Sequence, residues 1–354
     1  MPLQNIRQDI TQIQVNAIVN TSIKERVGYN IINNKIKAVM IGHAVGDALG
    51  VPVEFCSREE LTANPITDMV GYGSYPTPPG TWSDDTSMAL AALDSLSSGK
   101  VNAFEIMVNF SNWLSEGSYT PFGECFDVGR ACLYAIHTFA ERYYSQERGF
   151  VSPPYFDATE CGQQGEFSNG NGSLMRIHPF ALMTWYREEM RCDWESIIDQ
   201  ASALTHAHKR SKLACKIYTI ILHELLENPS KESILSALAN AKMKYSNNAE
   251  SYHYARLFDA DFAHLNVQNI KSSGYVVDTL EAALWCALTT ASYQDCVLKA
   301  VNLGDDTDTV AAVAGSIAGA LYGYDSIPAE WLGTLKRKDY IEEMCDRASK
   351  GWLD

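Results

Sequence analysis

Apolar residues recur at intervals of three and four along most of the chain, a spacing typical of helices with one buried face. The pattern holds over residues 35–49, 87–97, 103–115, 128–144, 201–227, 233–245, 279–291 and 310–321. Within 201–227 a broad apolar face is formed by Leu213, Ile217, Ile220, Ile221 and Leu225, and Pro229 is a stop signal shortly after it. The pattern therefore predicts an all-α fold.

The N-terminal segment follows a different pattern. Residues 1–30 are rich in Ile, Val, Thr and Asn without a helical period, and residues 15–19 are typical of one short strand. Segments rich in Gly, Pro, Ser and Asn at 71–82, 116–123 and 162–173 indicate loops between helices. We therefore expect a short extended arm over residues 1–30 and one helical domain over residues 31–354.

Composition narrows the classes of protein. The chain of 354 residues is 46% hydrophobic and carries a formal charge of −15, which does not fit a protein that binds long nucleic acids. Nine cysteines without a Cys-x-x-Cys pair indicate neither a disulfide framework nor a zinc knuckle. The N-terminus has no secretory pattern, and the apolar stretch 310–322, about 13 residues, is too short to span a membrane. We expect a cytoplasmic protein.

Acidic and hydroxyl residues gather at two junctions between a loop and a helix. They are Ser83, Asp84, Asp85 and Thr86 at the first junction, and Asp305, Asp306, Asp308 and Thr309 at the second. Such residues are good helix N-caps, but three acids within four positions cannot all cap one helix. Like charges ~4 Å apart repel by about 4 kcal/mol at an effective dielectric constant near 20. Either these are caps with solvated charges, or their hard oxygen atoms bind Mg²⁺, Mn²⁺ or Ca²⁺.

Each of three further segments has two possible interpretations, one structural and one functional. The small residues of 42–50, followed by Glu54, indicate close helix packing or an acid placed near a site. The loop 168–173 is either a plain turn or a set of donors for a diphosphate. The segment Thr205, His206, Ala207, His208 lacks metal spacing, so its histidines are hydrogen-bonded or capping residues unless a ligand contacts them.

Seven motifs in this order resemble the ADP-ribosylglycohydrolase family, which includes the enzyme that reactivates ADP-ribosylated dinitrogenase reductase. They lie at 46–50 with Glu54, 80–86, 126–129, 169–176, 205–206, 273–277 and 304–309. The resemblance implies a compact, orthogonal multi-helix fold with two Mg²⁺ or Mn²⁺ ions. The ligands that it implies are Ser83, Asp84, Asp85, Asp306, Asp308 and Thr309, whereas Asp305 falls outside the ligand set.

The resemblance also implies hydrolysis of the bond between ribose and a modified protein side chain, which releases ADP-ribose. Asp127 matches the carboxylate of the arginine-directed members and Tyr275 a substrate-pocket tyrosine of that branch. Glu54 matches an acid that serine-directed members place beside the metals. Asp127 and Tyr275 favour arginine, although Arg130 stands where the nitrogenase-regulating branch has Asn.

The same resemblance assigns the diphosphate and adenosine side of the substrate to His206 and to one loop. The loop residues are Ser168, Asn169, Gly170, Asn171, Gly172 and Ser173.

The arm itself resembles the opening of a macrodomain over residues 6–20, but about 15 residues cannot form that sheet. Some bacterial members of the family that resemble this chain are immunity proteins whose N-terminal extension plugs an ADP-ribosyltransferase toxin. An immunity or inhibitor protein that binds such a toxin through residues 1–30 is therefore the alternative function, with or without hydrolysis.

Overall fold

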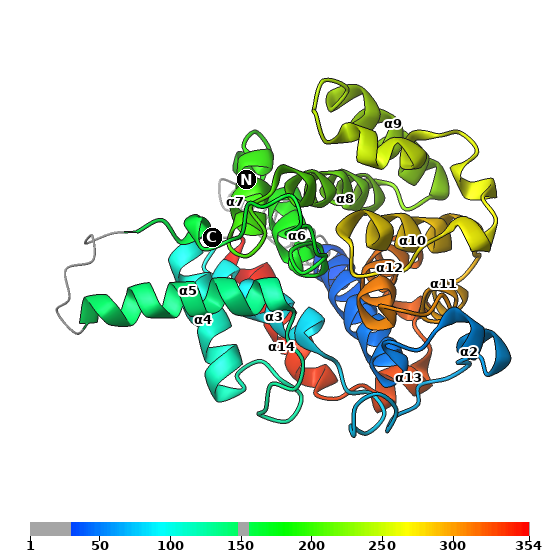
Figure 1. Ribbon diagram of the computed structural model, residues 1–354, viewed down its shortest axis with the longest axis horizontal. Coiled ribbons are helices and arrows are strands. Elements are labelled where there is room, and N and C mark those ends of the chain that lie inside the picture. The colour runs from blue at the N-terminus through cyan, green and yellow to red at the C-terminus, as the bar shows by residue number, and fades with distance from the viewer. Residues whose placement is uncertain (1–29, 148–155, 354) are drawn as a thin grey trace, which may run out of the picture.

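The computed structural model describes residues 30–147 and 156–353 (Figure 1). The predicted arm and its macrodomain-like segment lie outside the described residues, apart from residue 30, so the domain division and the toxin-binding role stay predictions. Within the described part the fold is all-α, as predicted, and it contains no strand, only two isolated bridges. The helices after the first one (residues 30–50) are α2 (Arg58–Ala63), α3 (Asp84–Leu96), α4 (Ala103–Glu116), α5 (Arg130–Glu147), α6 (His178–Tyr186), α7 (Trp194–Ala203), α8 (Lys209–Glu227), α9 (Lys231–Lys244), α10 (Val276–Thr289), α11 (Tyr293–Val301), α12 (Thr307–Tyr322), α13 (Ala329–Thr334) and α14 (Lys338–Gly351).

One predicted helix is wrong. The segment 201–227 forms the end of α7 and the whole of α8, separated by a loop that holds Thr205 and His206. The apolar face inside α8 is confirmed, because Leu213, Ile217 and Leu225 are fully buried. The periodicity alone did not reveal the break, since apolar residues continue through it.

The first helix and α12 form an antiparallel pair at the centre of the fold. A Cβ atom added at Gly42, Gly46 or Gly50 would lie only 2.5 Å from the Gly315 oxygen, 2.0 Å from the Ala311 oxygen or 2.3 Å from the Asp308 Cα atom. Only glycine allows two backbones to approach so closely. Helix packing, one of the two interpretations of this segment, is therefore confirmed. The pairing also brings the C-terminal end of the first helix against the N-terminal end of α12.

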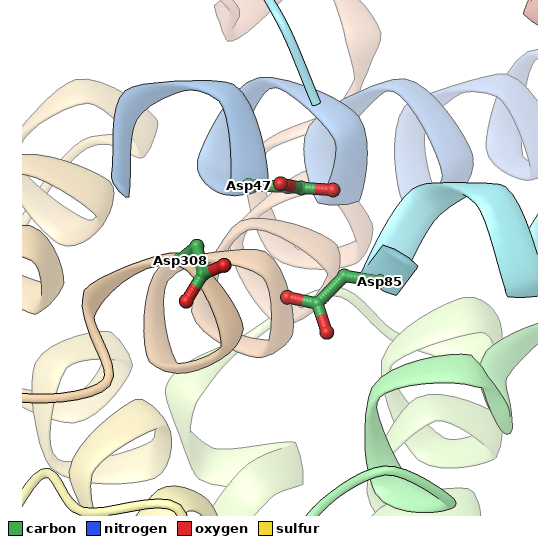
Figure 2. Close-up of side chains that lie close together, drawn as sticks. All are labelled: Asp47, Asp85 and Asp308. Carbon is green, nitrogen blue, oxygen red and sulfur yellow. The ribbon is translucent and has the colours of Figure 1, made fainter. Parts of the chain in front are cut away.

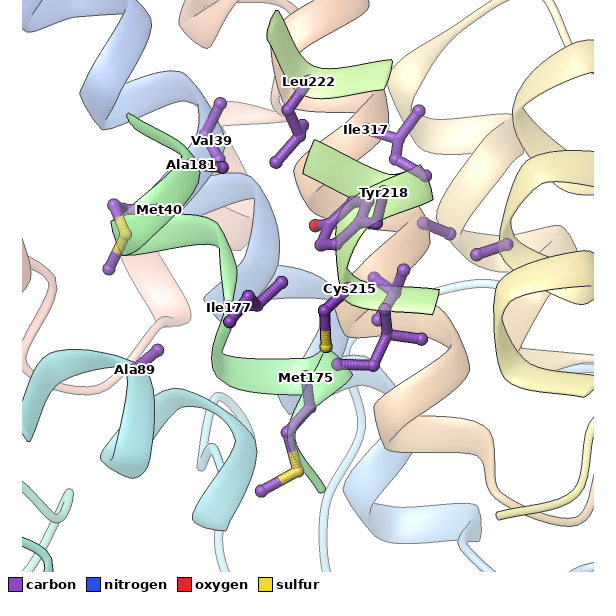
Figure 3. Packing of buried hydrophobic residues seen from close by; sticks show 14 of the residues in the cluster. Val39, Met40, Ala89, Met175, Ile177, Ala181, Cys215, Tyr218, Leu222 and Ile317 are labelled. Atoms are coloured by element: carbon purple, nitrogen blue, oxygen red, sulfur yellow. The ribbon is translucent and has the colours of Figure 1, made fainter. Parts of the chain in front are cut away.

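The core continues from this pair through α3, α6 and α8. Figure 3 shows Val39 and Met40 of the first helix near Ala181 of α6, and Tyr218 and Leu222 of α8 near Ile317 of α12. Burial of this apolar surface at roughly 25 cal/mol per Å² is the main favourable term of folding. The helix ends that carry the acidic residues are thus anchored in a packed interior.

The cysteines and the apolar stretches of the sequence can also be compared with the structure. All nine cysteines are free in the structure. Among the described residues one helical stretch, Asn30–Val53, which is the first helix together with the 3₁₀ turn Val51–Val53 that follows it, is long and apolar enough to cross a membrane, and the sequence did not lead us to expect it. Its most apolar window is 89% buried inside the protein, because this helix is the central core helix described above.

Candidate metal centre and substrate cavity

The two predicted acidic junctions meet in space. Oxygen atoms of Asp47, Asp85 and Asp308 all lie within 4.8 Å of one another, and so do oxygen atoms of Glu54, Asp127 and Asp308. Figure 2 shows the first group, with one carboxylate from each of three helices: the first helix, α3 and α12. Asp308 belongs to both groups. The arrangement thus offers two adjacent places for a cation with a shared ligand.

Asp47 fixes the first junction. Its carboxylate accepts hydrogen bonds from the backbone N–H groups of Ser83 and Thr86, at 2.9 and 3.0 Å, and from the Thr86 hydroxyl at 2.6 Å. The Ser83 hydroxyl in turn accepts from the Asp85 N–H group as the N-cap of α3. These bonds place Asp84 and Asp85 in the first turn of α3. Sequence reasoning gave Asp47 no role, although a fully buried acid inside an apolar helix is itself a signal of function.

The second junction is held by backbone contacts. Phe55 donates to the Asp305 carbonyl at 2.7 Å and Asp305 donates to the Cys56 carbonyl at 2.8 Å, and both Phe55 and Asp305 have a positive φ. Non-glycine residues in this region carry strain, and such strain gathers at functional sites. Asp305 itself is exposed, as expected for a residue outside the ligand set. The contacts bring Glu54 and Asp306 into neighbouring positions.

The buried acids are short of partners. Neither Glu54 Oε2 nor Asp85 Oδ2 has a hydrogen-bond partner, and no ion pair among the described residues involves any member of the two groups. Burial raises the pKa of Glu54 to about 8, with the Asp127 charge as the second cause. Burial also raises the pKa of Asp85 and of Asp308 well above its usual range. Unpaired buried carboxylate oxygens of this kind fit hard divalent cations.

A cavity of about 730 Å³ opens onto the acids. Its wall includes Glu54, Asp84, Asp127, Asp306, Asp308 and Thr309, together with Arg130. Other parts of the wall come from Ser168, Gly170, Asn171, Gly172 and His206. The Asn171 amide donates to Asp306 at 3.0 Å and so joins the predicted loop to the acidic junction.

Three predicted substrate residues lie elsewhere. Asn169 and Tyr275 line an adjoining hollow of about 380 Å³, where the Arg210 guanidinium lies 6.0 Å from the centre of the Tyr275 ring. Ser173 lines neither space. Its side chain is fully buried and its hydroxyl lies 3.0 Å from that of Ser202. The structure therefore favours a supporting position for Ser173 over ligand contact.

Sequence reasoning also missed two residues near the acids. Tyr75 lies near Glu54 and Asp127, whose pKa values its hydroxyl lowers against the larger effect of burial, and its ring lies 5.1 Å from that of Phe126. Arg58 donates to the carbonyl groups of Leu303, Val267 and Ile270, which fixes the loops that lead to the second junction. Neither residue lies in one of the seven motifs, so no local pattern marked it.

Comparison with known proteins agrees with this architecture. The family model for ADP-ribosylglycohydrolase matches residues 29–353. The chain is 33% identical to the ADP-ribosylarginine hydrolase Tri1 of Serratia proteamaculans over 89% of this chain and 78% of that protein. It is 31% identical to the ADP-ribosyl-[dinitrogen reductase] glycohydrolase of Rhodospirillum rubrum over 87% of this chain and 92% of that protein.

A solved structure gives the same result. The chain matches an ADP-ribosylglycohydrolase-related protein complex with a TM-score of 0.72 and 28% identity, over 91% of this chain and 99% of the other. The chain therefore belongs to the ADP-ribosylglycohydrolase family and is a glycohydrolase. Its buried acidic groups could bind metal ions.

Proposed function

We propose that this protein hydrolyses the bond between ADP-ribose and a protein arginine side chain, with two divalent cations, Mg²⁺ or Mn²⁺. The observation that carries the proposal is the two clusters of carboxylates that share Asp308. Their members have no ion-pair partner among the described residues, and Asp308 lies in the wall of the cavity. The names of the Serratia and Pseudomonas putida relatives, both ADP-ribosylarginine hydrolase Tri1, support arginine as the target.

The donor set fits the two cations. Asp85 and Asp308, two of the predicted ligands, lie within reach of a common cation, whereas Glu54 and Asp127 approach Asp308 in the second group and are kept for proton transfer. The other predicted ligands, Ser83, Asp84, Asp306 and Thr309, lie next to Asp85 and Asp308 on the same two helix ends. When bound, such cations supply positive charge for ribose hydroxyl groups and for a water molecule.

Protein side chains must move the proton. Cleavage at an anomeric carbon develops oxocarbenium character, and a guanidine leaves well only when it is protonated. Asp127 is half-buried in the cavity wall, and burial raises its pKa above the ordinary value, which suits a carboxyl group that both holds and releases a proton. Glu54, whose pKa burial raises to about 8, is the neighbouring carboxyl group with which that proton can be exchanged.

The other cavity residues suit the remainder of the substrate. Ser168, Gly170, Asn171, Gly172 and His206 line the same space as the acids, and the Ser168 hydroxyl, the glycine N–H groups and the His206 ring are possible hydrogen-bond donors. Such donors are appropriate for a diphosphate. A single cavity of this size can therefore place the ribose bond beside the acids and the diphosphate beside the loop.

The test compares two substrates under identical conditions. The purified protein with Mg²⁺ is given peptides ADP-ribosylated on arginine or on serine, and release of ADP-ribose is measured with and without a chelator. We expect release from arginine only, loss of release with the chelator, and a loss of about 10²–10⁴-fold in kcat for Asp127→Asn. Release from serine only, or full activity of Asp127→Asn, would contradict the proposal.

A further inference from the structure

In the part of the chain that the structure describes, the Arg176 guanidinium is buried without an ion-pair partner. Its side chain is fully buried at the end of η3 (Leu174–Arg176), its guanidinium carbon lies 4.9 Å from the centre of the Phe110 ring, and no ion pair among the described residues includes it. One nitrogen donates to the Ala201 carbonyl at 3.1 Å and to the Thr205 hydroxyl at 2.8 Å. A buried cation normally has an anionic partner, so this residue requires another explanation.

The Thr205 hydroxyl links Arg176 to His206. Its oxygen lies 2.8 Å from Nδ1 of the His206 ring. Because arginine can only donate, the Thr205 oxygen accepts from Arg176, and this polarises its O–H group into a stronger donor. An Nδ1–H group aimed at the same oxygen would bring a second positive N–H end beside the guanidinium.

If the hydrogen-bond direction between Thr205 and His206 is reversed, no second N–H group points at the Thr205 oxygen beside the guanidinium. If the Thr205 hydroxyl donates to Nδ1, the lone pair of the ring faces the polarised O–H group, and the ring hydrogen is on Nε2. The Cys132 sulfur also lies near this hydroxyl, but sulfur is a weak acceptor. Burial, followed by the Arg176 charge, lowers the pKa of His206 to about 3, so the ring is neutral and carries a single hydrogen.

The Nε2 side of the ring faces the loop at the cavity. A Cβ atom added at Gly170 would lie 3.4 Å from Nε2, and one added at Gly172 would lie 2.9 Å from Cε1. The backbone of His206 is fixed as well, because its N–H group donates to the Ser202 carbonyl at 2.8 Å and its carbonyl accepts from the Ser202 hydroxyl at 2.8 Å. The ring is therefore held at both its backbone and its Nδ1 atom.

We propose that Arg176, acting through Thr205, fixes His206 as the Nε2–H tautomer, so that the cavity presents a neutral N–H donor to a phosphate oxygen of the ligand. Arg176 is then a positioning residue for His206. The identity of the ligand as a diphosphate rests on the proposed function, whereas the tautomer does not.

The tautomer is measured directly on the full chain. Long-range ¹⁵N–¹H spectra of protein labelled at histidine distinguish the two neutral forms, and the His206 signals are assigned by their loss in His206→Gln. We expect the Nε2–H pattern in the unsubstituted protein and in Thr205→Ser, which keeps the hydroxyl. In Thr205→Val, which has the same shape without a hydroxyl, and in Arg176→Met, we expect the Nδ1–H form to appear.

Binding provides the second readout. ADP-ribose affinity is measured by calorimetry, with circular dichroism and melting temperature as checks of folding. We expect Thr205→Val to weaken binding about tenfold and Thr205→Ser to stay within about twofold, the effect of losing one oriented charge-assisted hydrogen bond.

Unexpected results in the tautomer measurement and in the affinity measurement contradict different parts of the inference. An Nδ1–H pattern in the unsubstituted protein, or an unchanged tautomer in folded Thr205→Val, overturns the inference even if the enzyme is active on arginine. The expected tautomers together with equal ADP-ribose affinity in all variants would overturn the phosphate contact. Absence of hydrolysis with the expected tautomers and affinities would instead count against the proposed function.

Discussion

Two parts of the same cavity region carry opposite charge imbalances. Around Asp308, five carboxylates lie together without a Lys, Arg or His partner within 4.0 Å among the described residues. Behind His206, Arg176 is buried, and within the ranges 30–147 and 156–353 it forms no ion pair with a carboxylate. Leaving a buried charge unpaired typically costs about 3–5 kcal/mol. Under the proposals above, cations would balance the carboxylates, and Arg176, which does not line the cavity, would act on the ligand through Thr205 and His206.

The largest effect is expected from removing the Asp308 carboxylate, which both acidic groups share. We expect Asp308→Asn to lower kcat by about 10³-fold or more, since both cation positions lose a charged ligand. The measurement is release of ADP-ribose at saturating Mg²⁺.

The neighbouring acid Asp305 provides the control. It is exposed and belongs to neither group, and asparagine tolerates its positive φ, so Asp305→Asn should keep nearly full activity. Equal losses in the two variants would mean that the acidic junction acts only as a structural unit.

The acidic region was largely predictable from the sequence, because three acids in four residues exceed what one helix cap can use. The support behind it was not predictable. Asp47 reaches the first junction only because the first helix passes beside α3, and Tyr75 and Arg58 act through contacts with distant segments. Such contacts leave no periodic trace along the chain.

The helices show the same limit. The residues of α6 from His178 through Trp185 are all buried, so this helix has no polar face to produce a period of 3.6. The break between α7 and α8 coincides with the bond from Arg176 to Thr205, which joins residues 29 positions apart. Local patterns predict elements with one buried face, but not those whose limits are set by a partner elsewhere in the chain.

A smaller expected effect concerns the stability of the acidic region. In the absence of divalent cations at pH 7, Asp85→Asn should raise the free energy of unfolding by a few kcal/mol, because burial raises the pKa of Asp85 well above its usual range and asparagine needs no proton to be buried there. Mg²⁺ should stabilise the unsubstituted protein, since it binds only the folded state, and should stabilise Asp85→Asn much less.

Chemical denaturation with a chelator or with Mg²⁺ measures both values, and Asp305→Asn is again the control. A loss of stability in Asp85→Asn without cations would mean that the Asp85 carboxylate is already compensated within the protein.

The smallest expected effect is on the pH dependence of stability, and it comes from a buried carboxyl group outside the cavity. Glu281 on α10 is almost fully buried but has a cation nearby, Arg256, at 3.5 Å. Burial raises its pKa from 4.5 to about 7 despite that neighbour. Because the folded state holds the proton more tightly than the unfolded state, this contribution to stability is complete below pH 4.5 and is lost as the pH rises towards 7.

The total contribution of Glu281 is on the order of 3 kcal/mol. We therefore expect Glu281→Gln to match the unsubstituted protein near pH 4.5 and to exceed it in stability above pH 7, by urea denaturation at saturating Mg²⁺ so that the acidic cluster does not contribute. Parallel stability curves would mean that Arg256 fully compensates Glu281. The contrast with the cavity acids would then be sharper. One partly exposed arginine would compensate the buried charge of Glu281, whereas no cationic side chain among the described residues forms an ion pair with Asp308.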